Sequence, residues 1–183
     1  MKDRIINIPK AFHELHGENS KLSSIILVYL AAIVVTSIFI VLLIPQNLPI
    51  WKYILVGLVY FDIAGGVVAN LSSSTNQYYQ RKKNLRFIFL FLHILQPFAL
   101  YVVFPKYLNY FVFIFLFTSS SSLIVNLIKN TEFQQNIAGF FIVVGIVISF
   151  IFNIDLIILY SVAPLFMIKL ILGFSVKRPS FHS

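Results

Sequence analysis

Six long apolar stretches constrain the fold of this chain more than any other feature. We place them at residues 22–44, 51–71, 86–104, 107–128, 137–152 and 156–174. Five of them have about 20 residues, the length that an α-helix needs to cross a hydrocarbon core of about 30 Å. Because no water is present there to bond the backbone, helices are the expected conformation. The sequence therefore predicts an all-α polytopic transmembrane helical bundle.

The fifth stretch, 137–152, is the shortest and leaves one alternative open. Only Asn153, Ile154 and Asp155 separate it from the sixth stretch. A bundle of five spans, with residues 137–174 partly re-entrant, would also fit this pattern. Six spans fit better, because two apolar stretches flank the polar break.

Composition excludes several classes of protein. Of 183 residues, 59% are hydrophobic and 11% are charged, whereas a soluble domain carries about 25% charged residues. No polar segment is long enough to fold alone, so we expect one bundle over 22–174, a basic cytoplasmic arm at 1–21 and a cytoplasmic tail at 175–183. The chain has no cysteine, which excludes disulfides and thiolate chemistry. The first stretch lacks a small-residue cleavage site and should remain as a span.

The distribution of positive charge predicts the orientation. Lys52 and Lys106 are the only lysines or arginines on one side of the predicted spans. The other twelve lie on the opposite side: Lys2, Arg4, Lys10, Lys21, Arg81, Lys82, Lys83, Arg86, Lys129, Lys169, Lys177 and Arg178. The positive-inside rule then places both chain ends in the cytoplasm.

The same charges predict the partners and the location. Basic residues beside apolar spans are typical contacts for anionic lipid headgroups, so the net charge of +8 does not indicate nucleic acid. We expect a multi-pass protein of the cell membrane. The abundance of Ile, Phe, Asn and Lys is typical of an AT-rich bacterial genome, which favours a bacterial plasma membrane.

The N-terminal arm has a weak amphipathic pattern. Ile5, Ile8, Phe12 and Leu15 recur at near-helical spacing among charged residues, which favours an interfacial helix on the inner membrane surface. Pro9 interrupts this pattern. The arm also contains His13-Glu14-Leu15-His16, but a zinc-binding H-E-x-x-H motif needs histidines four residues apart. We expect neither a metal nor a cofactor.

The second stretch carries an acid in its middle. Asp62 lies about 16 Å from one edge of the membrane at 1.5 Å per residue, where a carboxylate costs about 2.5–3.5 kcal/mol on insertion scales. Helical spacing places Gly66 and Ala69 on its face, with Gly65 and Asn70 close by. Small residues of this kind favour close helix packing, and Asn70 is a candidate for a polar pathway.

Other spans place polar groups at a similar depth. His93, Gln96 and Pro97 share one face of the third stretch, and Lys169 lies about 10 Å from the inner edge of the sixth. Thr118 and the serines at 119–122 come from the fourth. We expect the Asp62 carboxylate to bond His93, Gln96, Lys169 or one of these serines, since an unpaired acid is too costly. Pro97 should interrupt bonding near His93.

Three functions fit this polar layer. The first is a transport or permeation protein with a midplane site built from Asp62, His93 and Gln96, because acids and imidazoles at this depth are typical of proton relays. The second is an intramembrane lipid-modifying enzyme that uses an Asp62/His93 pair. The third is a non-catalytic scaffold or partner subunit. A bundle this small would transport as a homo-oligomer or in a larger complex.

Overall fold

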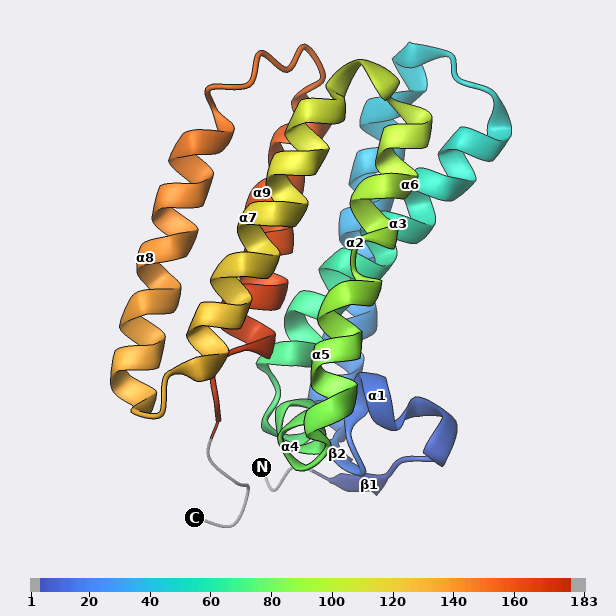
Figure 1. Ribbon diagram of the computed structural model, residues 1–183. Helices are drawn as coiled ribbons and strands as arrows, with labels where there is room; N and C mark the ends of the chain where they lie inside the picture. Colours follow the sequence, from blue (N-terminus) through green and yellow to red (C-terminus); the bar gives the residue numbers. More distant parts are fainter. Residues whose placement is uncertain (1–3, 179–183) are drawn as a thin grey trace.

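The computed structural model of the chain describes residues 4–178 and is almost entirely helical (Figure 1). The elements denoted η are 3₁₀-helices, except η5, which is a π-helix. In chain order the elements are β1 Ile5–Asn7, η1 Lys10–Phe12, α1 His13–His16, β2 Asn19–Lys21, α2 Leu22–Leu43, η2 Ile44–Gln46, α3 Ile50–Leu71, α4 Ser73–Arg81, α5 Lys83–Leu92, α6 Leu95–Val103, η3 Pro105–Tyr107, α7 Leu108–Leu127, α8 Thr131–Ser149, η4 Ile157–Ser161, α9 Val162–Met167 and η5 Ile168–Phe174.

Six helical segments within residues 4–178 are long and apolar enough to cross a membrane, which confirms the predicted number of spans. They are Leu22–Gln46, Ile50–Leu71, Leu85–Val103, Pro105–Leu127, Thr131–Ser149 and Ile157–Phe174. The protein is therefore an integral membrane protein with an all-α bundle.

The fifth span differs most from its predicted position. It begins at Thr131 rather than at residue 137 and has 19 residues. The polar residues that precede 137 form its first turns, because the Asn130 side chain accepts a hydrogen bond of 2.9 Å from the Phe133 N–H and caps the helix. At this length the span can cross the bilayer, so the re-entrant alternative loses its basis.

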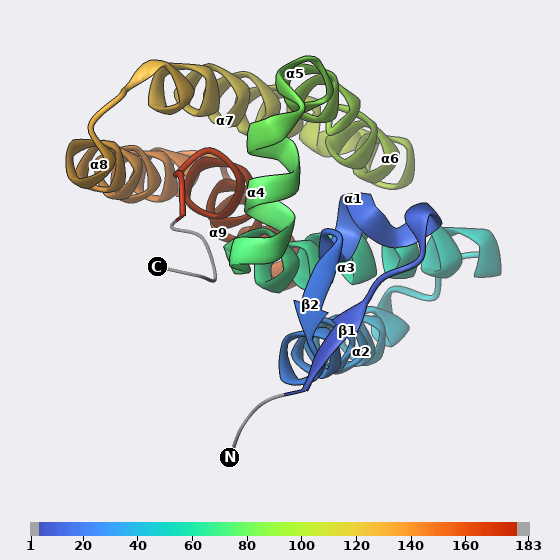
Figure 2. The same cartoon turned by 90° about the horizontal axis from the view of Figure 1, so that it is seen from below.

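The last span lies at the centre of the bundle and the first lies at its edge. In Figure 2, α9 is surrounded by α3, α7 and α8, while α2 packs against the outer side of α3. Within the most apolar 18 residues of each span, 61% of the residues are buried in the last span and 11% in the first. Large apolar side chains on the outer surface, such as Leu30 and Ile33 of α2, suit contact with lipid chains.

The N-terminal arm is not the continuous helix that its spacing favoured. β1 and β2 form an antiparallel pair with Ile5 opposite Lys21, and η1 and α1 lie between them. Gly17 ends α1 with a φ of +73°, which a residue with a side chain rarely adopts. The arm packs beside α4, since the Thr75 hydroxyl donates to the Leu15 carbonyl at 2.8 Å. Figure 1 shows the arm at the same end of the bundle as the last residues of η5.

The third span is broken where Pro97 predicts it. Pro97 has no N–H to donate to the carbonyl of His93, and that carbonyl instead accepts from the Gln96 N–H at 3.3 Å. Residues His93 and Ile94 form a turn between α5 and α6. The break allows the His93 side chain to point into the bundle.

Candidate functional site

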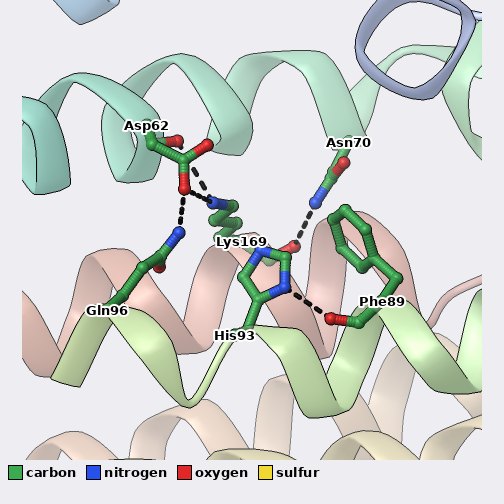
Figure 3. Close-up of polar contacts among 6 residues, drawn as sticks. All are labelled: Asp62, Asn70, Phe89, His93, Gln96 and Lys169. Atoms are coloured by element: carbon green, nitrogen blue, oxygen red, sulfur yellow. Dashed lines mark hydrogen bonds and ion pairs between the residues drawn. The ribbon is translucent and has the colours of Figure 1, made fainter. Parts of the chain in front are cut away.

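An ion pair between α3 and η5 forms the centre of the polar layer. The Lys169 ammonium nitrogen, Nζ, lies 2.9 Å from Asp62 Oδ2 and 3.2 Å from the Asp62 backbone carbonyl oxygen (Figure 3). Gln96 of α6 donates a second hydrogen bond from Nε2 to the same carboxylate oxygen. The structure thus brings together three of the residues that the sequence placed at one depth.

The same cluster has two oxygen atoms without partners in the described part of the chain. The second carboxylate oxygen of Asp62, Oδ1, takes part in no hydrogen bond there. The Gln96 carbonyl oxygen, Oε1, is buried and also has no partner. Unpaired acceptors inside a membrane protein mark positions where water or a donor group would be favourable.

The two members of the ion pair differ strongly in burial. Only 2% of the Lys169 side chain is exposed, compared with 55% of the Asp62 side chain. The surface around Asp62 is apolar, since Leu58, Phe61 and Leu95 are all exposed. One end of the pair therefore lies inside the bundle, and the other is reachable from outside it.

The two adjacent glycines of α3 contact different neighbours. A Cβ atom at Gly65 would lie 3.3 Å from Ala32 Cβ of α2, whereas one at Gly66 would lie 2.4 Å from Lys169 Cε. Gly65 thus permits close approach of α2, and Gly66 makes room for the lysine. Ala69 is 1% exposed and continues the small face.

Lys169 is carried by a π-helix, a conformation often found at functional sites. Its i→i+5 bonding is completed by the Ser175 N–H, which donates to the Leu170 carbonyl at 3.0 Å. The Asn70 side chain donates from Nδ2 to the Lys169 carbonyl at 3.1 Å (Figure 3). Asn70 therefore does not contact Asp62 but holds the backbone that carries its partner.

His93 lies in the layer without bonding Asp62 in the described structure. Its Nδ1 is 2.6 Å from the carbonyl oxygen of Phe89, and because a carbonyl only accepts, Nδ1 must carry a proton. In a neutral imidazole, the other ring nitrogen, Nε2, is then a hydrogen-bond acceptor. Figure 3 shows the ring pointing from the α5–α6 break toward α3.

The Ser and Thr hydroxyls of α7 do not bond the ion pair. Ser120 donates to the Leu116 carbonyl of its own helix at 2.7 Å, as serines in spans commonly do. Thr118, Ser119 and Ser122 have buried hydroxyls without partners in the region described. None of these hydroxyls bonds Asp62, so the site is made by α3, α6 and η5.

A second polar cluster was not predicted from the sequence. Asn76 of α4 donates from Nδ2 to the carbonyls of Gly173 and Val176, at 3.1 and 2.9 Å. Arg86 of α5 donates from Nη2 to the carbonyls of Phe174 and Ser175, at 3.0 and 2.8 Å. These contacts hold the C-terminal end of η5, so the segment that carries Lys169 is fixed at its far end.

Comparison with known proteins identifies no relative for this arrangement. The chain matches no family profile, no curated protein and no solved structure. Within residues 4–178, no group of three or more histidines and acids could hold a metal ion.

Proposed function

We propose that this membrane protein is a transport or permeation protein whose midplane site is the Asp62–Lys169 pair with Gln96 and His93 beside it. The observation that carries the proposal is the unequal burial of the pair. In the bundle alone, 55% of the Asp62 side chain is exposed on an apolar surface, where a charged carboxylate in contact with lipid is costly unless a proton, an ion or another group covers it. An acid that can be reached from outside, while its partner is held inside, suits reversible binding of a proton or an ion.

Proton binding at Asp62 would change the forces on the buried lysine. A protonated carboxyl group loses its charge and with it most of its attraction for the ammonium group. Lys169 would then keep only the weaker bond to the Asp62 backbone carbonyl, at 3.2 Å. The lysine tail packs directly against Gly66, which has no side chain to hold it, and we propose that the tail shifts when the pair is broken. This supplies a two-state element whose equilibrium a proton biases.

The two other functions receive unequal support. A lipid-modifying enzyme would need Asp62 and His93 as an acid–base pair, but no hydrogen bond joins them in the described structure. His93 Nδ1 instead donates to the Phe89 carbonyl oxygen. A partner subunit is favoured by one observation, the exposed apolar surface around Asp62. A donor from another transmembrane helix, or from a second copy of this chain, could cover the carboxylate there.

Flux through proteoliposomes tests the proposal. We expect the wild-type protein to carry protons or cations at a rate that changes between about pH 6 and 8. Asp62→Asn keeps the shape of the side chain but removes its charge, so flux should fall about tenfold or more while the protein stays folded. Asp155→Asn is the matched control, because Asp155 pairs with the exposed Lys106 far along the chain from the site. If Asp62→Asn transports like the wild type at every pH, the relay is excluded and the partner-subunit function is favoured.

The orientation of the protein in the membrane is a separate prediction. We expect both chain ends and the segment around Gln80 to face the cytoplasm of a bacterial plasma membrane, because the positive charges gather on that side. Reporter fusions after Gln80 and at the C-terminus should both give cytoplasmic signals, and an insertion after Lys106 should give an external one. A C-terminal reporter outside the cell would contradict this orientation.

A further inference from the structure

Two arginines at the end of the bundle beside the N-terminal arm have no counter-ion among residues 4–178. Arg86 is 7% exposed, and its only hydrogen bonds in the described chain go from Nη2 to backbone carbonyls at the end of η5 and just after it. Its Nε is buried without a partner. Arg178 also has a buried, unpartnered Nε. Among the described residues, no carboxylate lies within ion-pair distance of either guanidinium group.

Hydrogen bonds and one ring contact tie the two arginines to a small region. The backbone N–H of Arg178 donates to Asn76 Oδ1 at 3.1 Å, and Asn76 Nδ2 donates to the Val176 carbonyl oxygen at 2.9 Å. Arg86 Cζ lies 5.4 Å from the centroid of the Phe174 ring. Phe174, Val176 and Arg178 belong to the same segment, so its backbone places both side chains at the end of the central span.

A buried cation without a counter-ion is unfavourable unless an anion completes the site. Arg178 is partly buried, and this partial burial lowers the pKa of its guanidinium group. Among the described acidic residues at this end, Glu18 pairs with Arg81 at 3.2 Å, and neither Glu14 nor Glu132 lies within ion-pair distance of Arg86 or Arg178. Within residues 4–178, both guanidinium groups are therefore without an ion-pair partner.

We infer that Arg86 and Arg178 form a binding site for a phosphate group at the end of the central span. Guanidinium groups present paired N–H donors that match the oxygens of a phosphate, and basic pockets between transmembrane helices on the cytoplasmic side recognise lipid headgroups. The phosphate can belong to an anionic lipid of the adjacent leaflet or to a soluble ion. The inference does not depend on the transport function, since neither arginine contacts Asp62 or Lys169 in the described structure.

The test compares two variants that lose the same charge. Arg178→Gln is chosen because no hydrogen bond from the Arg178 side chain is found in the described part, so the substitution removes no internal hydrogen bond there. Lys129→Gln is the control, because Lys129 is an exposed basic residue on the same side outside the cluster. Arg86→Gln is avoided as the main variant, since Arg86 also holds the backbone at the end of η5.

The full-length protein is placed in bilayer discs of phosphatidylcholine with increasing phosphatidylglycerol, and its thermal unfolding midpoint is measured. We expect phosphatidylglycerol to raise the midpoint of the wild type and of Lys129→Gln alike, because a ligand of the folded state stabilises it. Arg178→Gln should need about tenfold more phosphatidylglycerol for the same shift. A second series adds inorganic phosphate to discs of phosphatidylcholine alone.

The two series distinguish the sources of the phosphate. A shift with phosphatidylglycerol alone that depends on Arg178 supports a lipid site, and a shift with inorganic phosphate that depends on Arg178 supports a soluble anion. If the two variants respond equally, the effect is general surface electrostatics and the site is refuted. The absence of any shift in the wild type in both series would refute it as well.

Discussion

Replacing Asp62 by leucine is expected to destabilise the protein more than replacing Lys169 by methionine. Asp62→Leu leaves an ammonium group that is almost fully buried with only a backbone carbonyl as its acceptor. Breaking a buried pair in this way costs about 3–5 kcal/mol. Lys169→Met leaves a carboxylate that is half exposed, can take up a proton and keeps its bond from Gln96, so we expect a cost of about 1–2 kcal/mol.

The double variant Asp62→Leu/Lys169→Met is the informative comparison. Because neither charge remains, its stability should recover to within about 1–2 kcal/mol of the wild type. Chemical unfolding of all four proteins in the same detergent gives the coupling energy directly. Equal losses for the two single variants would contradict the unequal burial of the pair. A stable double variant that no longer transports would assign the pair to function, because its removal then harms activity without harming the fold.

The spans and the polar layer could be predicted from the sequence because both depend on local pattern. Runs of apolar residues specify helices in a bilayer, and a fixed rise per residue converts position into depth. Counting residues along each span was therefore enough to place Asp62, Gln96 and Lys169 at compatible depths. The break at His93 followed in the same way from Pro97, whose missing N–H is a property of one residue.

The start of the fifth span shows the limit of hydropathy. Residues 131–136 are polar enough to resemble a loop, but a single Asn130 cap makes them the first turns of α8. A cap is a contact between one side chain and one backbone N–H, and an average over apolar residues does not register it. The arm differs from the interfacial helix that its apolar spacing favours for a related reason. Pro9 and Gly17 favour changes of chain direction, and apolar spacing does not register them.

Contacts between distant segments could not be predicted. Asn76 and Arg86 bond backbone carbonyls 100 and 88 positions further along the chain. Every residue has a backbone carbonyl, so the sequence does not indicate which of them will accept these bonds. The π-helix η5 is also stabilised by distant neighbours, because Asn70 of α3 and Asn76 of α4 donate hydrogen bonds to its carbonyls. The hydrogen-bond partner of His93 also depends on the direction in which its side chain leaves the helix. The depth of the residue in the membrane does not specify that direction.

The final prediction concerns Gly66, and its matched control is Gly139. A Cβ at Gly66 would lie 2.4 Å from Lys169 Cε and 2.9 Å from Nζ, whereas one at Gly139 would meet nothing within 4 Å. The lysine tail is flexible, so the steric cost of Gly66→Ala alone is small. The larger cost arises because the displaced ammonium loses its acceptors on Asp62, and charged hydrogen bonds contribute about 1.5–3 kcal/mol each.

We therefore expect Gly66→Ala to unfold at a lower temperature and to lose the flux proposed for the wild type, while Gly139→Ala keeps both. The effect should nearly vanish in a Lys169→Met background, where the shorter side chain carries no charge and less bulk. Persistence of the full loss in that background would mean that Gly66 serves packing alone. The dependence on Lys169 matters because, of the two adjacent glycines of α3, only Gly66 contacts the lysine. The comparison with Gly65→Ala therefore separates helix packing from accommodation of the buried charge.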